Sequence, residues 1–150
     1  MSDLYFEDFK PGDVFESPGL TVTEAQIINF AMMWDPVSFH LDVEDAAQHE
    51  LGGLFASGFQ TAAITFRLFR QTGALDKCNI AGAGMDKLRW HKPVRPGDTL
   101  YSVAEVTGSR ASQSKPDRGT VTMAHRALNQ HGETVFSVDC VHMVRRRPKA

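Results

Sequence analysis

A long apolar helix in the first half of the chain is the feature that most constrains the fold. Ser57 and Gln60 have the spacing of an N-terminal capping box, and Gly73 is a typical C-terminal stop. The apolar side chains between them recur at helical spacing and predict one inward-facing side, formed by Phe59, Ala62, Ala63, Phe66 and Phe69. Because so apolar a helix is unstable in water, it has to pack inside a larger structure.

The second half of the chain changes to the two-residue period of β-strands. Three runs are rich in strand-forming residues (100–106, 120–128 and 135–144), and Leu88 opens an earlier strand that ends at Pro93. The polar segment 109–118 predicts a loop. These runs predict a meander of antiparallel strands after the helix.

The segment before the long helix predicts two shorter helices. Thr23 begins the first of them, and Asp35 ends it because the residue before a proline disfavours the helical conformation. Residues 42–48 predict the second, and the backbone between the two is expected to be irregular.

Helices followed by antiparallel strands predict an α+β fold, with residues 1–150 forming one domain. One apolar helix with about five strands suggests a curved sheet wrapped around that helix, which is the hot-dog arrangement. Such a sheet has an open edge, and edges of this kind are usually covered. We therefore expect a homodimer, or a higher assembly of dimers.

Composition and charge exclude several classes of protein. The apolar fraction of 42% and charged fraction of 23% are ordinary for a globular chain, and the net charge of −2 argues against nucleic-acid binding. The sequence contains no apolar run long enough to span a membrane and no signal-peptide pattern. Cys78 and Cys140 have no C-x-x-C spacing, so we expect free thiols and a cytoplasmic location.

Asp35 and His40 are the first candidates for chemistry. A carboxylate and an imidazole five residues apart, in a proline-containing segment, combine titratable groups with a rigid backbone. Each residue also has a structural explanation: aspartate before proline commonly starts a turn, and an isolated histidine is commonly a satisfied core or surface group.

Ser57 and Gly58 are the second candidates, because they lie where the long helix begins. A helix N-terminus presents unpaired N–H groups and a dipole that favours negative charge. Gly58 allows a ligand to approach the backbone closely. The alternative is structural: Ser57 simply caps the helix. Both functions are compatible if the cap leaves the Gly58 N–H available as an oxyanion donor.

Other chemistries lack their motifs. The sequence around Ser57 is not the G-x-S-x-G elbow of serine hydrolases, and it contains no phosphate-binding glycine loop. The histidines and cysteines show neither H-E-x-x-H nor C-x-x-C spacing, so the sequence predicts no metal site and no cofactor.

The stretch that contains Asp35 and His40 resembles the hydratase motif of MaoC-like dehydratases and (R)-specific enoyl-CoA hydratases. Residues 30–42 carry the Asp–His pair at that family's spacing, and residues 5–14, 52–58 and 92–100 are also similar to it. The resemblance covers most of the chain, in the correct order.

The resemblance implies a hot-dog dimer that acts on acyl-CoA or another acyl-pantetheine thioester. Asp35 and His40 would together activate water for addition to a trans-2-enoyl thioester, and the Gly58 N–H would hold the thioester oxygen. Three basic residues at the end of the first long strand are expected to help hold the phosphates of the ligand: Arg89, Lys92 and Arg95.

Two alternatives stay open. A hot-dog thioesterase would share fold and ligand, but its carboxylate commonly lies on or beside the central helix, and residues 58–72 contain neither Asp nor Glu. A non-catalytic acyl-CoA-binding protein is the other alternative, and the presence of both Asp35 and His40 argues against it.

Overall fold

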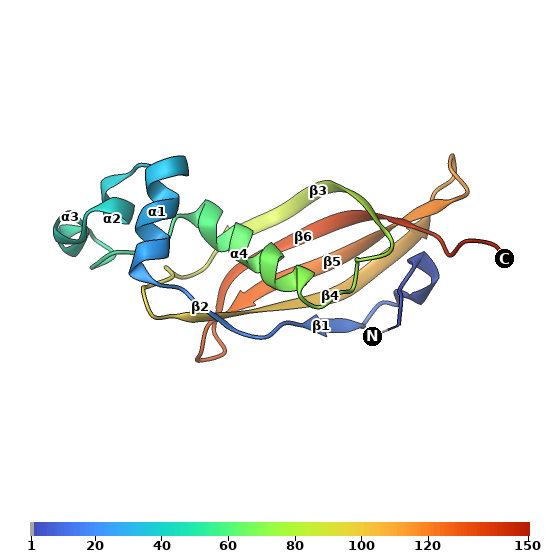
Figure 1. Cartoon of the computed structure of the whole chain (residues 1–150), viewed down its shortest axis with the longest axis horizontal. Coiled ribbons are helices and arrows are strands. Elements are labelled where there is room, and N and C mark those ends of the chain that lie inside the picture. Colours follow the sequence, from blue (N-terminus) through green and yellow to red (C-terminus); the bar gives the residue numbers. More distant parts are fainter. Residues whose placement is uncertain (1) are drawn as a thin grey trace.

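The computed structural model describes residues 2–150 and places one long helix against an antiparallel sheet (Figure 1). The helical elements are a 3₁₀ turn η1 (Phe6–Asp8), α1 (Glu24–Trp34), α2 (Ser38–Leu41), α3 (Val43–Gln48) and α4 (Gly58–Arg70). The strands are β1 (Val14–Glu16), β2 (Leu20–Thr21), β3 (Asn79–Trp90), β4 (Thr99–Ala111), β5 (Arg118–Leu128) and β6 (Thr134–Arg145).

The sheet follows the order β1-β4-β5-β6-β3, and every neighbouring pair is antiparallel. The short strand β2 also pairs with β4. Figure 1 shows α4 along one face of the long strands, while α1, α2 and α3 gather at one end of the molecule. This is the α+β hot-dog arrangement that the sequence predicts, and it leaves β3 at an edge of the sheet.

The inward side of α4 differs from the predicted one. The buried residues of the helix are Gln60, Thr61, Thr65, Leu68 and Phe69, whereas Phe59 is 64% exposed. Buried threonine is tolerated because the Thr65 hydroxyl donates to the Thr61 carbonyl at 2.7 Å. The prediction followed the spacing of the apolar residues and placed all three phenylalanines of the helix inward, whereas Phe69 is the one that is fully buried.

The strand boundaries also correct the prediction. Strand β3 begins at Asn79, and Leu88 lies near its end rather than at its start. The sequence obscures this start because the segment 81–84 is alternating alanine and glycine, which have low β propensity. Pairing with β6 makes the segment a strand despite that composition. Likewise β4 extends to Ala111 because its backbone pairs with β5 as far as Gly119.

The predicted alternation of β6 is confirmed, and it extends further than predicted. Val138, Cys140 and Val144 are buried on one face, and His142 is buried with them. Cys78 and Cys140 are both buried and unbonded. No helix within residues 2–150 combines the length and the apolar character needed to cross a membrane.

We expect the two ends of α4 to differ sharply in their sensitivity to alanine. Phe69→Ala should lower the free energy of unfolding by about 3–5 kcal/mol, because Phe69 is 1% exposed in the core. Phe59→Ala, the matched change on the exposed side, should stay within about 1 kcal/mol of the parent. Urea unfolding of both variants measures this, and equal losses would contradict the observed orientation of the helix.

Candidate active site

A cavity of about 490 Å³ opens where the start of α4 meets α1, α2 and the end of β3. Four of the residues predicted from the sequence line it: Asp35, His40, Gly58 and Lys92. Ser57 does not line the cavity but contacts Asp35 directly. Residues that are distant in sequence therefore meet at the N-terminal end of the central helix.

Local sequence explains how Asp35 and His40 are mounted. Asp35 is the C-cap of α1, and its N–H donates to the Ala31 carbonyl at 3.0 Å before Pro36 ends the helix. His40 lies on α2, a single helical turn that the sequence analysis treated as irregular backbone. A four-residue helix carries too little periodicity to be detected from sequence.

The geometry fixes the tautomer of His40. Its Nδ1 lies 2.6 Å from the Phe55 carbonyl, which can only accept, so Nδ1 carries a proton. In the neutral ring Nε2 is then an acceptor, and it lies 3.6 Å from Oδ2 of Asp35. That separation is too long for a direct hydrogen bond. The Asp35 carboxylate and the His40 Nε2 are therefore two proton acceptors that lie close together at the cavity.

Ser57 connects the start of α4 to the carboxylate. Its hydroxyl donates to Asp35 Oδ2 at 2.6 Å, and its oxygen accepts from the Phe59 N–H at 3.3 Å. The helix cap is thus confirmed, but the predicted capping box does not form, because the Gln60 amide donates to the Gln26 carbonyl instead. Ser57 is completely buried, so its hydrogen bond holds the carboxylate in one orientation.

Gly58 begins α4, and its N–H has no hydrogen-bond partner among residues 2–150. The Trp90 indole packs against it and donates to the Gly58 carbonyl at 2.9 Å. A Cβ at this position would lie 2.6 Å from the indole ring, so glycine is required for this packing. Trp90 was not predicted as a site residue, because its one signal in the sequence is a large aromatic side chain at the end of a strand.

An aromatic wall supports His40 from behind. The rings of Phe39 and Phe55 stack with centroids 5.2 Å apart, and His40 meets Phe55 edge-on at 4.9 Å. His40 is 4% exposed as a result. These contacts limit rotation of the imidazole and keep its Nε2 directed toward the cavity.

The three predicted phosphate-binding residues have different surroundings. Lys92 lines the cavity and pairs with Glu133, and this hydrogen bond holds the pKa of Glu133 below its ordinary value. The Arg95 guanidinium donates to the carbonyls of Gly53 and Leu51, so it braces the segment that precedes α4.

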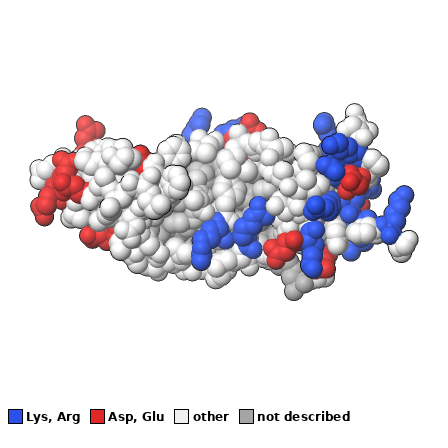
Figure 2. Space-filling view, turned by 45° about the horizontal axis from the view of Figure 1, so that its top comes forward, with Lys and Arg blue, Asp and Glu red and all other residues white. Residues whose placement is uncertain are grey.

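Arg89 is exposed and donates to the Leu88 carbonyl at 2.8 Å. The charges on the face drawn in Figure 2 are unevenly distributed. Figure 2 shows acidic side chains gathered at the end formed by α1–α3 and basic ones concentrated toward the opposite end. Lys92 is the basic residue of the cavity lining, and it is paired with Glu133.

Comparisons with known proteins agree on one family. Residues 8–128 match the family model described as the MaoC like domain. The crystal structure of a MaoC-like dehydratase from Rhodospirillum rubrum has a TM-score of 0.89 and 42% identity, covering 97% of this chain and 99% of that one.

Two curated proteins are also similar. The uncharacterized protein YdeM of Bacillus subtilis is 32% identical over 143 residues, covering 95% of this chain and all of that protein. The mesaconyl-CoA hydratase of Cereibacter sphaeroides is 42% identical over 71 residues, which are 47% of this chain and 20% of that protein. The match in sequence spans most of the chain and the match in structure nearly all of it, and the chain belongs to the MaoC-like hydratase and dehydratase family.

Proposed function

We propose that the protein adds water to, or removes it from, the double bond of an enoyl-thioester. The observation that carries the proposal is the meeting of three groups at one cavity: the Asp35 carboxylate, the His40 Nε2 and the unpartnered Gly58 N–H. Hydration needs a proton acceptor for water and a donor for the developing oxyanion, and this site offers both.

In the hydration direction, a water lies between Asp35 Oδ2 and His40 Nε2 and donates to them. The pair takes one proton as the water oxygen bonds to C3 of the enoyl group. The electrons of the C2–C3 double bond move toward the thioester oxygen, where the Gly58 N–H donates to the negative charge. The pair then returns a proton to C2, and dehydration is the same path reversed.

The position of Gly58 at the start of α4 strengthens this donor. A helix N-terminus carries a partial positive charge, and it favours an anion within the first turn. Trp90 packs against the same glycine and gives this part of the cavity an aromatic, less polar wall. A hydrogen bond in a less polar environment contributes more to the stabilisation of developing charge than one in open water.

The substrate we propose is an acyl-CoA or an acyl-carrier thioester, without a metal or cofactor in the reaction. The similarity to mesaconyl-CoA hydratase supports the CoA thioester class, and a cavity of about 490 Å³ has the size of an ordinary small-molecule site. A thioesterase is less well supported, because the segment Gly58–Arg70 contains no carboxylate to activate water against the C–S bond.

We expect Asp35 and His40 to act as one catalytic unit. Asp35→Asn keeps shape but removes the base, and His40→Ala removes the second acceptor, so each should lower kcat by about 10²–10⁴-fold. The double variant should lose little more than either single one. The measurement is the loss of enoyl-thioester absorbance during hydration of a short trans-2-enoyl-CoA.

Asp117→Asn and His131→Ala are matched controls, since both residues are exposed and neither lines the cavity. They should keep the parent rate. Folded Asp35 and His40 variants with parental rates would refute the assignment. A parent protein that binds but never converts a panel of enoyl-CoAs would favour the non-catalytic alternative.

Lys92, with Arg89 and Arg95, is proposed to bind the phosphates of CoA. The double reversal Arg89→Glu/Lys92→Glu should raise KM for an enoyl-CoA by about 5- to 30-fold, since exposed ion pairs contribute up to about 1 kcal/mol each. KM for an enoyl-pantetheine, which lacks those phosphates, should not change.

Arg95 is left intact because it braces residues 51–54. Lys115→Glu, far from the cavity, is the control, and equal effects on both substrates would contradict phosphate binding.

We also propose a cytoplasmic homodimer. The edge strand β3 carries a run of exposed residues that includes Met85, and an open edge is normally covered. Sedimentation at micromolar concentration should give twice the chain mass of 16.6 kDa. Met85→Lys should shift the equilibrium toward monomer, whereas Lys115→Glu should not, and a monomeric parent would refute the dimer.

A further inference from the structure

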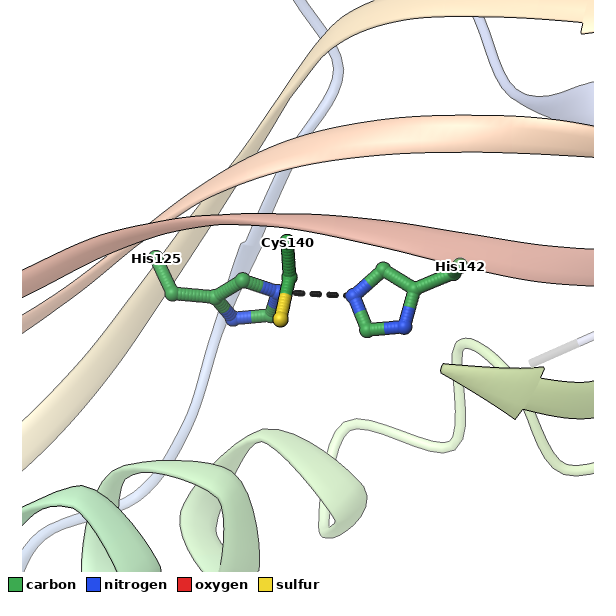
Figure 3. Close-up of side chains that lie close together, drawn as sticks. All are labelled: His125, Cys140 and His142. Atoms are coloured by element: carbon green, nitrogen blue, oxygen red, sulfur yellow. Dashed lines mark hydrogen bonds between the residues drawn. The ribbon is translucent and has the colours of Figure 1, made fainter. Parts of the chain in front are cut away.

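Three buried side chains with metal-binding donors meet far from the proposed active site. His125 on β5 and Cys140 and His142 on β6 place one donor atom each within 4.8 Å of one another. Figure 3 shows them on the same side of the sheet, facing α4, with the two imidazoles pointing toward one another. None of the three lines the cavity that contains Asp35 and His40.

Strand pairing explains why they meet. His125 lies opposite Val138, so Cys140 is its diagonal neighbour on the same face, and His142 follows two residues further along β6. The rings of Phe66 and Phe69 on α4 cover the group, with centroids 5.0 and 4.7 Å from that of His125. All three side chains are thus enclosed between helix and sheet.

The contact between the two histidines leaves a ring nitrogen of His125 without a partner. Their Nε2 atoms lie 2.9 Å apart and share one proton, which satisfies one nitrogen of each ring. The Nδ1 of His125, a residue with no exposed surface, has no hydrogen-bond partner among residues 2–150. A buried imidazole nitrogen without a partner is costly, and it marks a site where a ligand or a displaced proton can be accommodated.

Burial favours the uncharged form of all three donor groups. Burial, with a smaller contribution from Arg70, lowers the pKa of His142 to about 4. Burial and the neighbouring His142 lower that of His125 to about 3, so both rings are neutral at neutral pH. Burial also raises the pKa of the Cys140 thiol, and a bound metal has to displace that proton.

We propose that His125, Cys140 and His142 form a three-coordinate site for one monovalent copper ion. Two imidazoles and one thiolate suit soft and borderline metals, and Cu⁺ with a single thiolate is electrically neutral. A divalent ion would leave a net positive charge in a buried site that already has Arg70 nearby, which is unfavourable.

Movements of about 1 Å are sufficient for coordination, because the three donor atoms lie within 4.8 Å of one another and metal–sulfur bonds of about 2.3 Å need sulfur–nitrogen separations of about 3.7 Å. Metal–nitrogen bonds of about 2.0 Å in trigonal geometry separate the two nitrogens by about 3.4 Å, compared with 2.9 Å in the empty site. On binding, the Cys140 thiol releases its proton to solvent. The proton shared by the two Nε2 atoms moves to an Nδ1, and the unpartnered Nδ1 of His125 provides a place for it.

The test is an anaerobic titration of the full chain with Cu⁺ in competition with bicinchoninate. We expect one tightly bound ion per chain. Cys140→Ala should weaken binding by at least about 100-fold, because even outer partners of metal ligands contribute about 10–100-fold. Cys78→Ala is the matched control, since Cys78 is the other buried thiol of the chain and does not belong to the group, so that variant should bind as the parent does.

A second measurement uses only the parent protein, so its result does not depend on whether the variants fold. X-ray absorption of the parent Cu⁺ complex should show one sulfur and two nitrogen neighbours. A shell without sulfur would overturn the proposal, as would equal weakening by Cys78→Ala, or Zn²⁺ binding at the site while Cu⁺ does not.

Discussion

The packing of α4 against the sheet is the constraint on which the rest of the structure depends. Leu68 and Phe69 are buried in the C-terminal half of the helix, and Thr65 is buried one turn earlier because its hydroxyl bonds to the helix backbone. With that half fixed, the N-terminal end projects to where α1, α2 and β3 meet. Ser57 then contacts Asp35, and Gly58 contacts Trp90. The cavity is therefore formed by contacts that exist only when the helix is packed against the sheet.

Much of the fold was predictable because its signals are local. The cap at Thr23, the break at Asp35 and the alternation of β6 all depend on neighbours within a few positions. The start of β3 was not predictable, since its alanines and glycines become a strand only through pairing with β6. The orientation of α4 was missed for a similar reason: hydrogen bonds of Thr65 and Gln60, invisible in the sequence, permit their burial.

The residues of the candidate sites also divide into those that local sequence could predict and those that it could not. Asp35 and His40 could be proposed from sequence because they share one short segment. The hydrogen bond from Ser57 to Asp35 joins residues 22 positions apart, and the indole of Trp90 reaches Gly58 across 32. His125, Cys140 and His142 match no metal-binding sequence motif. On paired strands, donors of one strand lie two residues apart, and donors of two strands meet only through the register of the pairing, which the sequence does not show. The spacing Cys140-x-His142 within a buried strand was the available signal.

The two ends of α4 offer opposite electrostatic environments, and each proposed site matches the end that it occupies. The N-terminal end has unpaired N–H groups and favours negative charge, as the thioester oxygen requires. The last turn contains Phe69, which lies against His125 and His142, and the partial negative charge of that end favours a cation. Arg70 in the same turn opposes a cation, so the balance permits a single positive charge more readily than two. One helix thus separates a solvent-accessible anion site from a dry site suited to a soft monovalent cation.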